Sequence, residues 1–258
     1  MCTRGKRRFL LPTKRLNLTA TPTPASPSSP ATPATTASPS PATPATSALS
    51  PIPSSYKRAL LDPLWLSAMR DEFNALQQNN TWTLVPTPPG VNVVSGKWVF
   101  RHKFHSDGTL ARYKARWVCR GFSQQQGIDF DETFSPIVKP DTIRVVLSFA
   151  VSSSWPIHQL DVKNAFLHGT LNETVYCQQP SGFEDPSSPN SVCLLHKSLY
   201  GLIQAPRPWF QRFAAFIQTA GFIPSKSDSS LFIFRSSSHI AYLLLYVDDI
   251  VLTVGDMP

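Results

Sequence analysis

The sequence predicts an α+β fold built around an antiparallel sheet, and three observations support this. Three stretches show the three-and-four spacing of apolar residues that is typical of amphipathic helices. Two pairs of apolar runs are each joined by a short polar turn, which is the pattern of a β-hairpin. Residues 19–55 are almost wholly Thr, Pro, Ala and Ser, a composition that buries too little apolar surface to offset its ordering entropy. We therefore expect a disordered tail over residues 1–55, basic and then Pro-rich, before a folded domain over residues 56–258.

Three helices are expected, and the first is the best defined. It is predicted to begin at Asp62-Pro63, because Asp is a favoured N-cap and Pro is favoured at the first helical position. Apolar residues then recur at helical spacing until Asn79-Asn80. The expected buried face consists of Leu66, Met69, Phe73 and Leu76. The other two helices are predicted over residues 141–151 and 208–220, and Gly221 is a natural stop for the last one.

Strands are expected where Val, Ile, Leu and aromatic residues gather in short runs. Single strands are predicted at residues 81–86, 157–161 and 231–235. One hairpin is predicted from residues 97–104 and 112–122 around the turn at 105–108. A second spans residues 240–254, with Asp248 and Asp249 at its turn. These hairpins favour an antiparallel sheet.

The positive charge of the chain is concentrated in two places. The net charge is +8, but the first 58 residues carry eight of the 24 Lys and Arg residues and none of the 16 Asp and Glu residues. The rest of the chain is therefore balanced, and the high isoelectric point alone does not make the folded part a polyanion binder.

The hairpin at residues 97–122 is the basic part of the folded domain. Residues 97–120 contain seven basic residues against one acidic residue, Asp107. The basic residues are Lys97, Arg101, Lys103, Arg112, Lys114, Arg116 and Arg120. Because aromatic residues alternate with them, the pattern suits a surface for nucleic acid or a triphosphate. A solvated outer face is the alternative.

Several classes of protein are disfavoured by composition. The four cysteines lack the spacing of a zinc site or a disulfide framework, which fits a reducing intracellular compartment. No run of about 18 uninterrupted apolar residues is present, so no membrane span is expected. The sequence GKRR near the N-terminus could direct the protein to the nucleus.

The pair Asp248-Asp249 is an unusual choice for a hairpin turn, because such turns favour Asn-Gly or Asp-Gly. Two carboxylates about 4 Å apart repel each other by about 4 kcal/mol at an effective dielectric constant near 20. A divalent cation would remove this repulsion. On these residues alone, a polar surface turn and a metal site are both open.

A third carboxylate, Asp161, is expected at the end of the strand 157–161. Two or three Asp residues suffice for a site that holds two Mg²⁺ ions for in-line displacement at phosphorus, since Mg²⁺ also uses waters and substrate phosphates. Polymerases, nucleotidyl cyclases and some nucleases all show such a pattern.

Longer strings in the sequence are more specific. They are KWVF (97–100), RYKARWVCRGF (112–122), QGIDFDETFSPIV (126–138), HQLDVKNAFLHG (158–169), VYCQQPSGF (175–183), KSLYGLIQAPRPW (197–209) and YLLLYVDDI (242–250). In this order they closely resemble the reverse transcriptase domain of copia-type LTR retrotransposon polyproteins, from about Tyr56 to the C-terminus. The Pro-rich segment before them resembles the spacer between integrase and reverse transcriptase in these polyproteins.

The resemblance implies a right-hand polymerase, with fingers followed by palm, that copies an RNA or DNA template-primer with dNTPs. It implies that Asp161, Asp248 and Asp249 bind two Mg²⁺ or Mn²⁺ ions, with Asp249 coordinating more weakly. The backbone carbonyl of Val162 would bridge to the metal or the triphosphate. The resemblance also implies an intracellular, cytoplasmic location, with the nucleus as an alternative, and no membrane partner.

The resemblance further assigns residues to substrates. Lys114 and Arg116 are similar to fingers residues that grip the triphosphate. Phe166 matches an aromatic steric gate under the sugar, with a plain core aromatic as the alternative. Tyr200-Gly201 would pack near the incoming nucleotide. Expected nucleic-acid contacts are Lys97, Arg101, Lys103, Arg112, Arg120, Gln204 and Arg207, the last two of which could instead support the loop.

The sequence departs from the family pattern in two respects. Ile203 stands where the family usually has Lys, and Trp117 stands where it usually has Leu, so the first change puts a template or phosphate contact in doubt. From the resemblance, we expect the protease and integrase that precede in the family, and the thumb and RNase H that follow, to be missing from this chain. We therefore expect it to extend a primer poorly by itself. The alternatives are an inactive or domesticated fragment that at most binds nucleic acid, and an interaction protein built on the Pro-rich tail.

Overall fold

A computed structural model describes residues 18–20 and 49–256. It confirms a mixed α+β fold with mostly antiparallel sheets. The basic stretch with GKRR and most of the predicted tail lie outside the described residues. Residues 18–20, which were expected to be disordered, form a short strand, β1 (Leu18–Ala20), that pairs with β6.

The helices lie close to where the sequence predicts them, with one addition. They are α1 (Tyr56–Leu61), α2 (Pro63–Gln78), α3 (Pro140–Ser152) and α4 (Pro206–Thr219), with short 3₁₀ turns η1 (Gly121–Ser123) and η2 (Ala165–His168). The helix α1 was not predicted. Asp62 ends it and caps α2, where the Asp62 side chain accepts from the backbone N–H groups of Leu64 and Trp65.

Strands form three sheets. The six-stranded sheet has the order β1, β6 (Ile157–Val162), β12 (Asp249–Asp256), β11 (His239–Tyr246), β10 (Leu231–Arg235), β9 (Ile223–Pro224). The four-stranded sheet has the order β2 (Trp82–Pro86), β8 (Ser191–Leu195), β7 (Tyr176–Cys177), β3 (Val93–Val94). The third is the hairpin of β4 (Gly96–Phe104) and β5 (Leu110–Cys119). The pair β3–β7 is parallel, an exception to the predicted antiparallel order.

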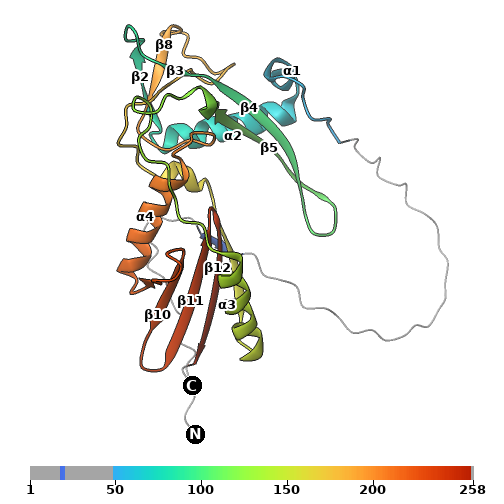
Figure 1. Ribbon diagram of the computed structural model, residues 1–258. Helices are drawn as coiled ribbons and strands as arrows, with labels where there is room; N and C mark the ends of the chain where they lie inside the picture. Colours follow the sequence, from blue (N-terminus) through green and yellow to red (C-terminus); the bar gives the residue numbers. More distant parts are fainter. Residues whose placement is uncertain (1–17, 21–48, 257–258) are drawn as a thin grey trace, which may run out of the picture.

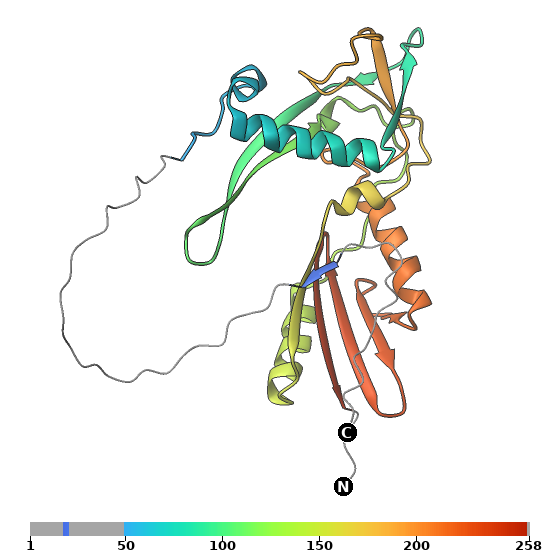
Figure 2. The same ribbon diagram turned by 180° about the vertical axis from the view of Figure 1, so that it is seen from behind.

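The six-stranded sheet is covered by a helix on each face, and we call this part the sheet unit (Figures 1 and 2). Alternate residues of β11 point to opposite faces. One set packs in a cluster with α4, and the other packs in a cluster with α3. The α4 side contains Trp209, Phe213, Ile217, Ala241, Leu243 and Leu245, and the α3 side contains Val146, Tyr242 and Leu244.

The remaining elements form a second core, which we call the hairpin unit. Figures 1 and 2 show α2 lying along the hairpin β4–β5, above the sheet unit. The Trp65 ring of α2 meets the Phe100 and Tyr113 rings edge-on at centroid distances of 5.4 and 4.8 Å. Phe166 of η2 packs against the clusters of both units.

The buried face of α2 is rotated by about one position from the predicted one. The buried residues are Trp65, Ala68, Met69, Glu72 and Leu76, whereas Leu66 and Phe73 are half-buried. The large Trp65 side chain, rather than Leu66, fills the space under the aromatic face of the hairpin, because aromatic side chains bury the most area. The rotation also places a carboxylate, Glu72, in the core.

The turn between β11 and β12 is also displaced by one residue. Tyr246 pairs with Asp249, so the two turn residues are Val247 and Asp248, and Asp249 opens β12. The prediction that both aspartates form the turn was wrong in register. The reason is that Asp249 lies in strand pairing with both Tyr246 and Asp161, which leaves Val247 to turn the chain.

Three of the cysteines lie close together in the hairpin unit. Cys119, Cys177 and Cys193 are buried and free, and the sulfur atoms of Cys119 and Cys177 are 3.4 Å apart. A hydrogen bond with Cys177 and burial raise the pKa of the Cys119 thiol. Within residues 18–20 and 49–256, no helix has the length and apolar character needed to cross a membrane.

Candidate active site

Asp161 and Asp249 lie directly opposite each other on the neighbouring strands β6 and β12. Directly opposed residues of an antiparallel pair project to the same face of the sheet. Gln159 lies two residues before Asp161 and projects to the same face, and it opposes the rise in the pKa of Asp249. The register of β6 and β12 therefore brings Asp161 next to the Asp248-Asp249 sequence.

Asp248 lies beside this pair, in the turn. Its backbone carbonyl accepts a hydrogen bond of 3.3 Å from the N–H of Val162. Val247 has a φ of 57°, which is rare for a β-branched residue. The Trp209 indole N–H of α4 donates to the Val247 carbonyl at 2.6 Å and so holds the turn. Backbone strain of this kind is concentrated at functional sites.

The three carboxylates repel one another. Burial first, and then the charges of Asp248 and Asp161, raise the pKa of Asp249, while the Gln159 hydrogen bond opposes the shift. A cation at the site would reverse this effect, and carboxylate oxygens are the donors that Mg²⁺ prefers. Among the described residues, no group of three or more His, Cys, Asp or Glu side chains is arranged to hold a metal ion. Asp161, Asp248 and Asp249 carry the donor type that Mg²⁺ prefers, but a metal there would need substrate phosphates and waters as further ligands.

The hairpin β4–β5 has one cationic face and one aromatic face. The register pairs Arg101 with Lys114 and Lys103 with Arg112. Together with Lys97 and Arg116, these residues share one face, since opposed residues point the same way. We call these six residues the cationic face. Like charges directly opposite each other are destabilising, so this face favours an anionic partner.

The aromatic residues that alternate with them belong to the opposite face. Trp98 pairs with Trp117, and the two indole rings lie 5.5 Å apart between centroids in the core. These rings are therefore core residues. Arg120 follows β5 and is exposed.

Lys114 and Arg116 connect this hairpin to the carboxylates. Lys114 is half-buried, and burial followed by the charges of Arg116, Arg112 and Lys103 lowers its pKa to about 8, which Asp161 partly opposes. The Arg116 guanidinium carbon lies 3.7 Å from the centroid of the Tyr200 ring. The Arg116 Nε and the Tyr200 hydroxyl are both buried and have no hydrogen-bond partner in the described part of the chain.

Tyr200 lies between Arg116 and Phe166. Its ring meets the Phe166 ring edge-on with centroids 4.7 Å apart. Burial, with contributions from Asp248 and Asp161, raises the pKa of Tyr200 to about 12 against the opposing effect of Arg116. The structure thus brings the predicted residues Arg116, Tyr200 and Phe166 into contact. Lys114 and Tyr200 are influenced by the charge of Asp161, and Tyr200 also by that of Asp248.

Gly201 allows a close backbone approach, as predicted, but to β5. Its φ is 91°, and an added Cβ would overlap the Cys119 carbonyl oxygen. The Tyr200 carbonyl accepts from the Cys119 N–H at 2.8 Å, and the Gly201 carbonyl accepts from the Gly121 N–H at 3.1 Å. The loop is thereby fixed to the end of the basic hairpin.

Gln204 and Arg207 lie apart from this group. Gln204 is fully buried, its amide N–H donates to the Asp129 carbonyl at 2.9 Å, and its oxygen accepts from Gln124 at 3.0 Å. It therefore supports the loop, which was one of the two predicted roles. The Ile203 side chain, at the position where Lys is usual, is 42% exposed.

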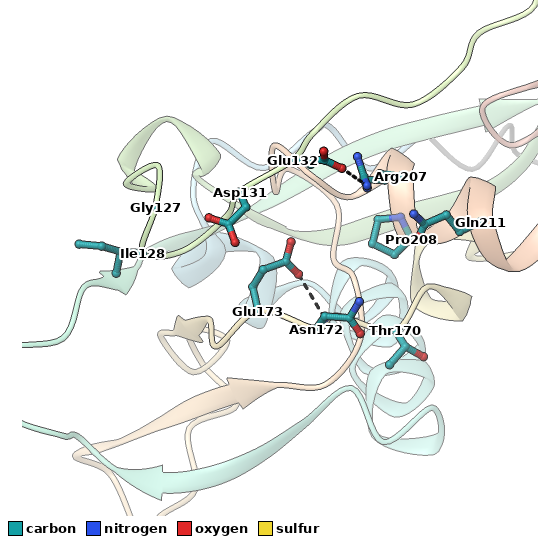
Figure 3. A pocket seen from close by; sticks show the side chains of 10 residues that line it. All are labelled: Gly127, Ile128, Asp131, Glu132, Thr170, Asn172, Glu173, Arg207, Pro208 and Gln211. Atoms are coloured by element: carbon teal, nitrogen blue, oxygen red, sulfur yellow. Dashed lines mark hydrogen bonds and ion pairs between the residues drawn. The ribbon is translucent and has the colours of Figure 1, made fainter.

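Arg207 forms an ion pair with Glu132 at the edge of a separate cavity of about 430 Å³ (Figure 3). Asp131 and Glu173 also line this cavity. None of the aspartates at the β6–β12 junction contributes to its wall, so it is distinct from the candidate site.

Sequence reasoning missed Glu72 and the two supporting residues Gln159 and Trp209. Glu72 is 8% exposed, and burial raises the pKa of its carboxyl group against the opposing effects of Arg116, the Trp117 backbone N–H and Lys114. A signal was present, because Glu72 lies three residues after Met69 and four before Leu76, at helical spacing within the apolar face.

Comparison with known proteins places the sequence in a family. Residues 79–258 match the family described as reverse transcriptase (RNA-dependent DNA polymerase). The chain is 51% identical over 205 residues to the retrovirus-related Pol polyprotein from transposon RE1 of Arabidopsis thaliana, and 50% identical over 205 residues to that from transposon RE2 of the same plant. It is 46% identical over 208 residues to the Pol polyprotein from transposon TNT 1-94 of Nicotiana tabacum.

Each alignment covers 79% of this chain, but only 14%, 14% and 16% of the respective relatives. The chain thus spans a small part of the length of these polyproteins. The family match covers more than half of the chain and includes all three aspartates. The chain therefore belongs to the reverse transcriptase family, as a domain of the type found in copia-type Pol polyproteins.

Proposed function

We propose that this domain is an RNA-directed DNA polymerase that transfers nucleotides by a two-metal mechanism. The observation that carries the proposal is the register of β6 and β12, which sets Asp161 opposite Asp249 and beside the Asp248 turn. The sheet unit would correspond to the palm and the hairpin unit to the fingers. The proposed substrates are an RNA or DNA template-primer and dNTPs, and the proposed location is intracellular.

Asp161 and Asp248 would hold two Mg²⁺ or Mn²⁺ ions, with the backbone carbonyl of Val162 as a further oxygen donor. Bound there, the ions would activate the primer hydroxyl and neutralise charge at the reacting phosphate. Asp249 would coordinate more weakly, as the resemblance to the family implies.

The hairpin unit would bind and orient the nucleotide. Lys114 and Arg116 would bind the triphosphate, because charge-assisted hydrogen bonds to phosphate are the strong ones. Phe166, held by Tyr200, would lie under the sugar and exclude a 2′-hydroxyl. The exposed cations Lys97, Arg101, Lys103, Arg112 and Arg120 would contact the template-primer backbone.

Primer extension by the whole chain tests this proposal. The Asp248→Asn variant should lose more than the roughly 10–100-fold that removal of an outer-shell partner costs, because a donor of charge to the metals is lost. Asp256→Asn is the matched control, since Asp256 is exposed at the far end of the same strand, β12, and should extend the primer at the parent rate. If the parent extends the primer measurably, equal extension by Asp248→Asn, or extension that persists in excess chelator, would contradict the mechanism.

The cationic face supports a second candidate, a fragment that binds nucleic acid without catalysis. The same preparation separates the two, because fluorescence anisotropy with a labelled template-primer reports binding alone. Binding without extension in either Mg²⁺ or Mn²⁺ would favour the inactive fragment.

A further inference from the structure

We propose that Trp209 is a positioning residue for the candidate site, whose indole N–H holds the Val247-Asp248 turn in the form that lies against β6. This inference rests on the proposed function, since it explains how one of the proposed metal ligands, Asp248, is kept in place. Trp209 itself would touch neither a metal ion nor the nucleotide.

The turn needs support because of the residue at its first position. Two-residue hairpin turns of types I′ and II′ have a positive φ at this position, and Gly, Asn or Asp is the usual choice there. This chain has Val247 instead, with a φ of 57°, and a Cβ makes the left-handed conformation costly. Of the two turn residues, only Val247 has a positive φ. Local sequence preference therefore does not explain the observed turn.

The Trp209 indole is placed to stabilise this turn. The side chain is 1% exposed, and its N–H donates to the Val247 carbonyl at 2.6 Å. An indole has a single polar group, its N–H, and here that group is used on the strained residue. The next carbonyl, that of Asp248, accepts from the Val162 N–H at 3.3 Å. The turn is thus held by α4 at Val247 and by β6 at Asp248.

Trp209 also lies against the chain that leaves Asp161. Gly169 directly follows η2, and a Cβ added to it would lie 2.8 Å from the Trp209 backbone nitrogen. The Trp209 side chain belongs to the same buried cluster as Val162, the residue after Asp161. One residue of α4 therefore lies against both segments that carry the proposed metal ligands.

The test compares Trp209→Phe in the full 258-residue chain with the parent. Phe keeps an aromatic ring in the core but removes the indole N–H. Trp98→Phe is the matched control, because the Trp98 side chain is also buried and its indole N–H donates to a loop carbonyl, that of Ser181, at 2.9 Å in the hairpin unit.

The measurement is amide hydrogen exchange by NMR, given as the exchange rate of the Val162 N–H divided by that of the Trp155 N–H. The Val162 N–H is bonded to the turn, whereas the Trp155 N–H donates to the Ala150 carbonyl at 2.8 Å. Trp155 lies at the far end of β12, beside Gly255. A general loss of stability raises both rates, so the ratio reports the turn.

In Trp209→Phe we expect this ratio to rise about tenfold, which corresponds to the loss of about one hydrogen bond. In Trp98→Phe it should keep the parent value. If the parent extends a primer, kcat should fall in Trp209→Phe while the KM for dTTP stays equal, because the metal ligand moves and the hairpin unit does not.

Val247→Gly supplies a rescue that would not occur if Trp209 only filled space. Gly adopts a positive φ without steric cost, so the turn should no longer depend on the indole. In Trp209→Phe/Val247→Gly the exchange ratio should return to the parent value, and kcat with it.

A further check needs no variant. In the parent, the Trp209 indole N–H should exchange with solvent as slowly as the Val162 N–H, because both are released when the turn opens.

The outcomes separate this inference from the proposed function. An unchanged ratio in Trp209→Phe, an equal rise in Trp98→Phe, or no rescue by Val247→Gly would overturn the positioning role. Rapid exchange of the Trp209 indole N–H in the folded parent would do the same. Failure of the parent to extend a primer would count against the proposed function, while hydrogen exchange would still decide the role of Trp209.

Discussion

Gly201 is the residue at which the loop carrying Tyr200 comes closest to the basic hairpin. Its left-handed backbone and the nearby Cys119 carbonyl and Val118 side chain leave no room for a Cβ. The same contact sets the position of Tyr200, and through it the positions of Arg116 and Phe166. A small change at this residue should therefore affect both stability and the candidate site.

The substitution Gly201→Ala should lower the free energy of unfolding by more than about 1–2 kcal/mol, which is the conformational cost of a left-handed residue with a Cβ. The excess comes from displacement of the Cys119 carbonyl. Urea denaturation followed by tryptophan fluorescence measures the change.

Gly108→Ala is the matched control for this prediction. Gly108 has a φ of 83°, but no described atom lies within 4 Å of its added Cβ, so only the conformational cost should remain. Equal losses in the two variants would mean that the approach to Cys119 is unimportant.

At the residue scale, sequence patterns identify the carboxylates more readily than their supports. Asp161, Asp248 and Asp249 stand out because a carboxylate is rare beside apolar strand residues. Glu72 does not, because the spacing of apolar residues gives no sign of a buried carboxylate. The same spacing predicts a buried face of α2 about one position away from the observed one. Val247 was missed for another reason, since no propensity predicts that a β-branched residue will take a positive φ.

Among the elements, the hairpin β4–β5 has two faces of different chemical character. One face is buried on α2, and the other gathers six cations. The sequence predicts the strands and the charge, but alternation alone leaves the aromatic residues as part of an expected surface for nucleic acid or a triphosphate. Only the position of α2 decides that they are core, and a contact between segments so far apart in the chain has no local signal.

The double substitution Arg101→Gln/Lys103→Gln should weaken binding to duplex nucleic acid through the loss of phosphate contacts. The slope of log K against log salt concentration should become shallower by about 0.9 for each contact removed, and the melting temperature should rise or stay equal, because repulsion from Lys114 and Arg112 is relieved. Anisotropy titrations between low and physiological salt measure the slope.

Arg144→Gln/Lys226→Gln controls for the change in net charge, because both residues are exposed and lie outside the hairpin. If the slope of log K against log salt concentration becomes equally shallow in this variant, binding depends on net charge and not on the cationic face.

At the scale of the whole molecule, Phe166 joins two hydrophobic cores. It packs against both the hairpin unit and the sheet unit, which is a core role, while its role under the sugar is a proposal. The mixed α+β fold was predictable from periodicity. The division into two cores, the parallel pair β3–β7 and the pairing of β1 with β6 were not, because each depends on contacts between distant segments.

The substitution Phe166→Ala should separate the unfolding of the two units. Cys119, Cys177 and Cys193 all belong to the hairpin unit, so thiol labelling in increasing urea reports that unit, in a Cys2→Ser background. In the parent, labelling should coincide with the loss of far-ultraviolet circular dichroism. In Phe166→Ala, labelling should begin at a lower urea concentration than the loss of circular dichroism. The total loss in free energy of unfolding should be smaller than the about 3–5 kcal/mol that truncation of a fully buried Phe costs.

Phe149→Ala is the control, because Phe149 is a partly exposed aromatic residue of α3 that contacts Trp155 and Tyr242 within the sheet unit. In Phe149→Ala, the urea curves for thiol labelling and for circular dichroism should stay coincident. Coincident curves in Phe166→Ala as well would show that the two cores are coupled by other contacts.

The strand order of the sheet unit has a consequence for synthesis on the ribosome. The strand β12 lies between β6 and β11, although it is made after both. Until residues 249–256 have emerged, β6 and β11 each present an unpaired edge, and such edges invite pairing with other chains. Asp161 and Asp249 can meet only after β12 has emerged, so the nascent chain has no opposed carboxylates until this strand is inserted between β6 and β11 and their edges are closed.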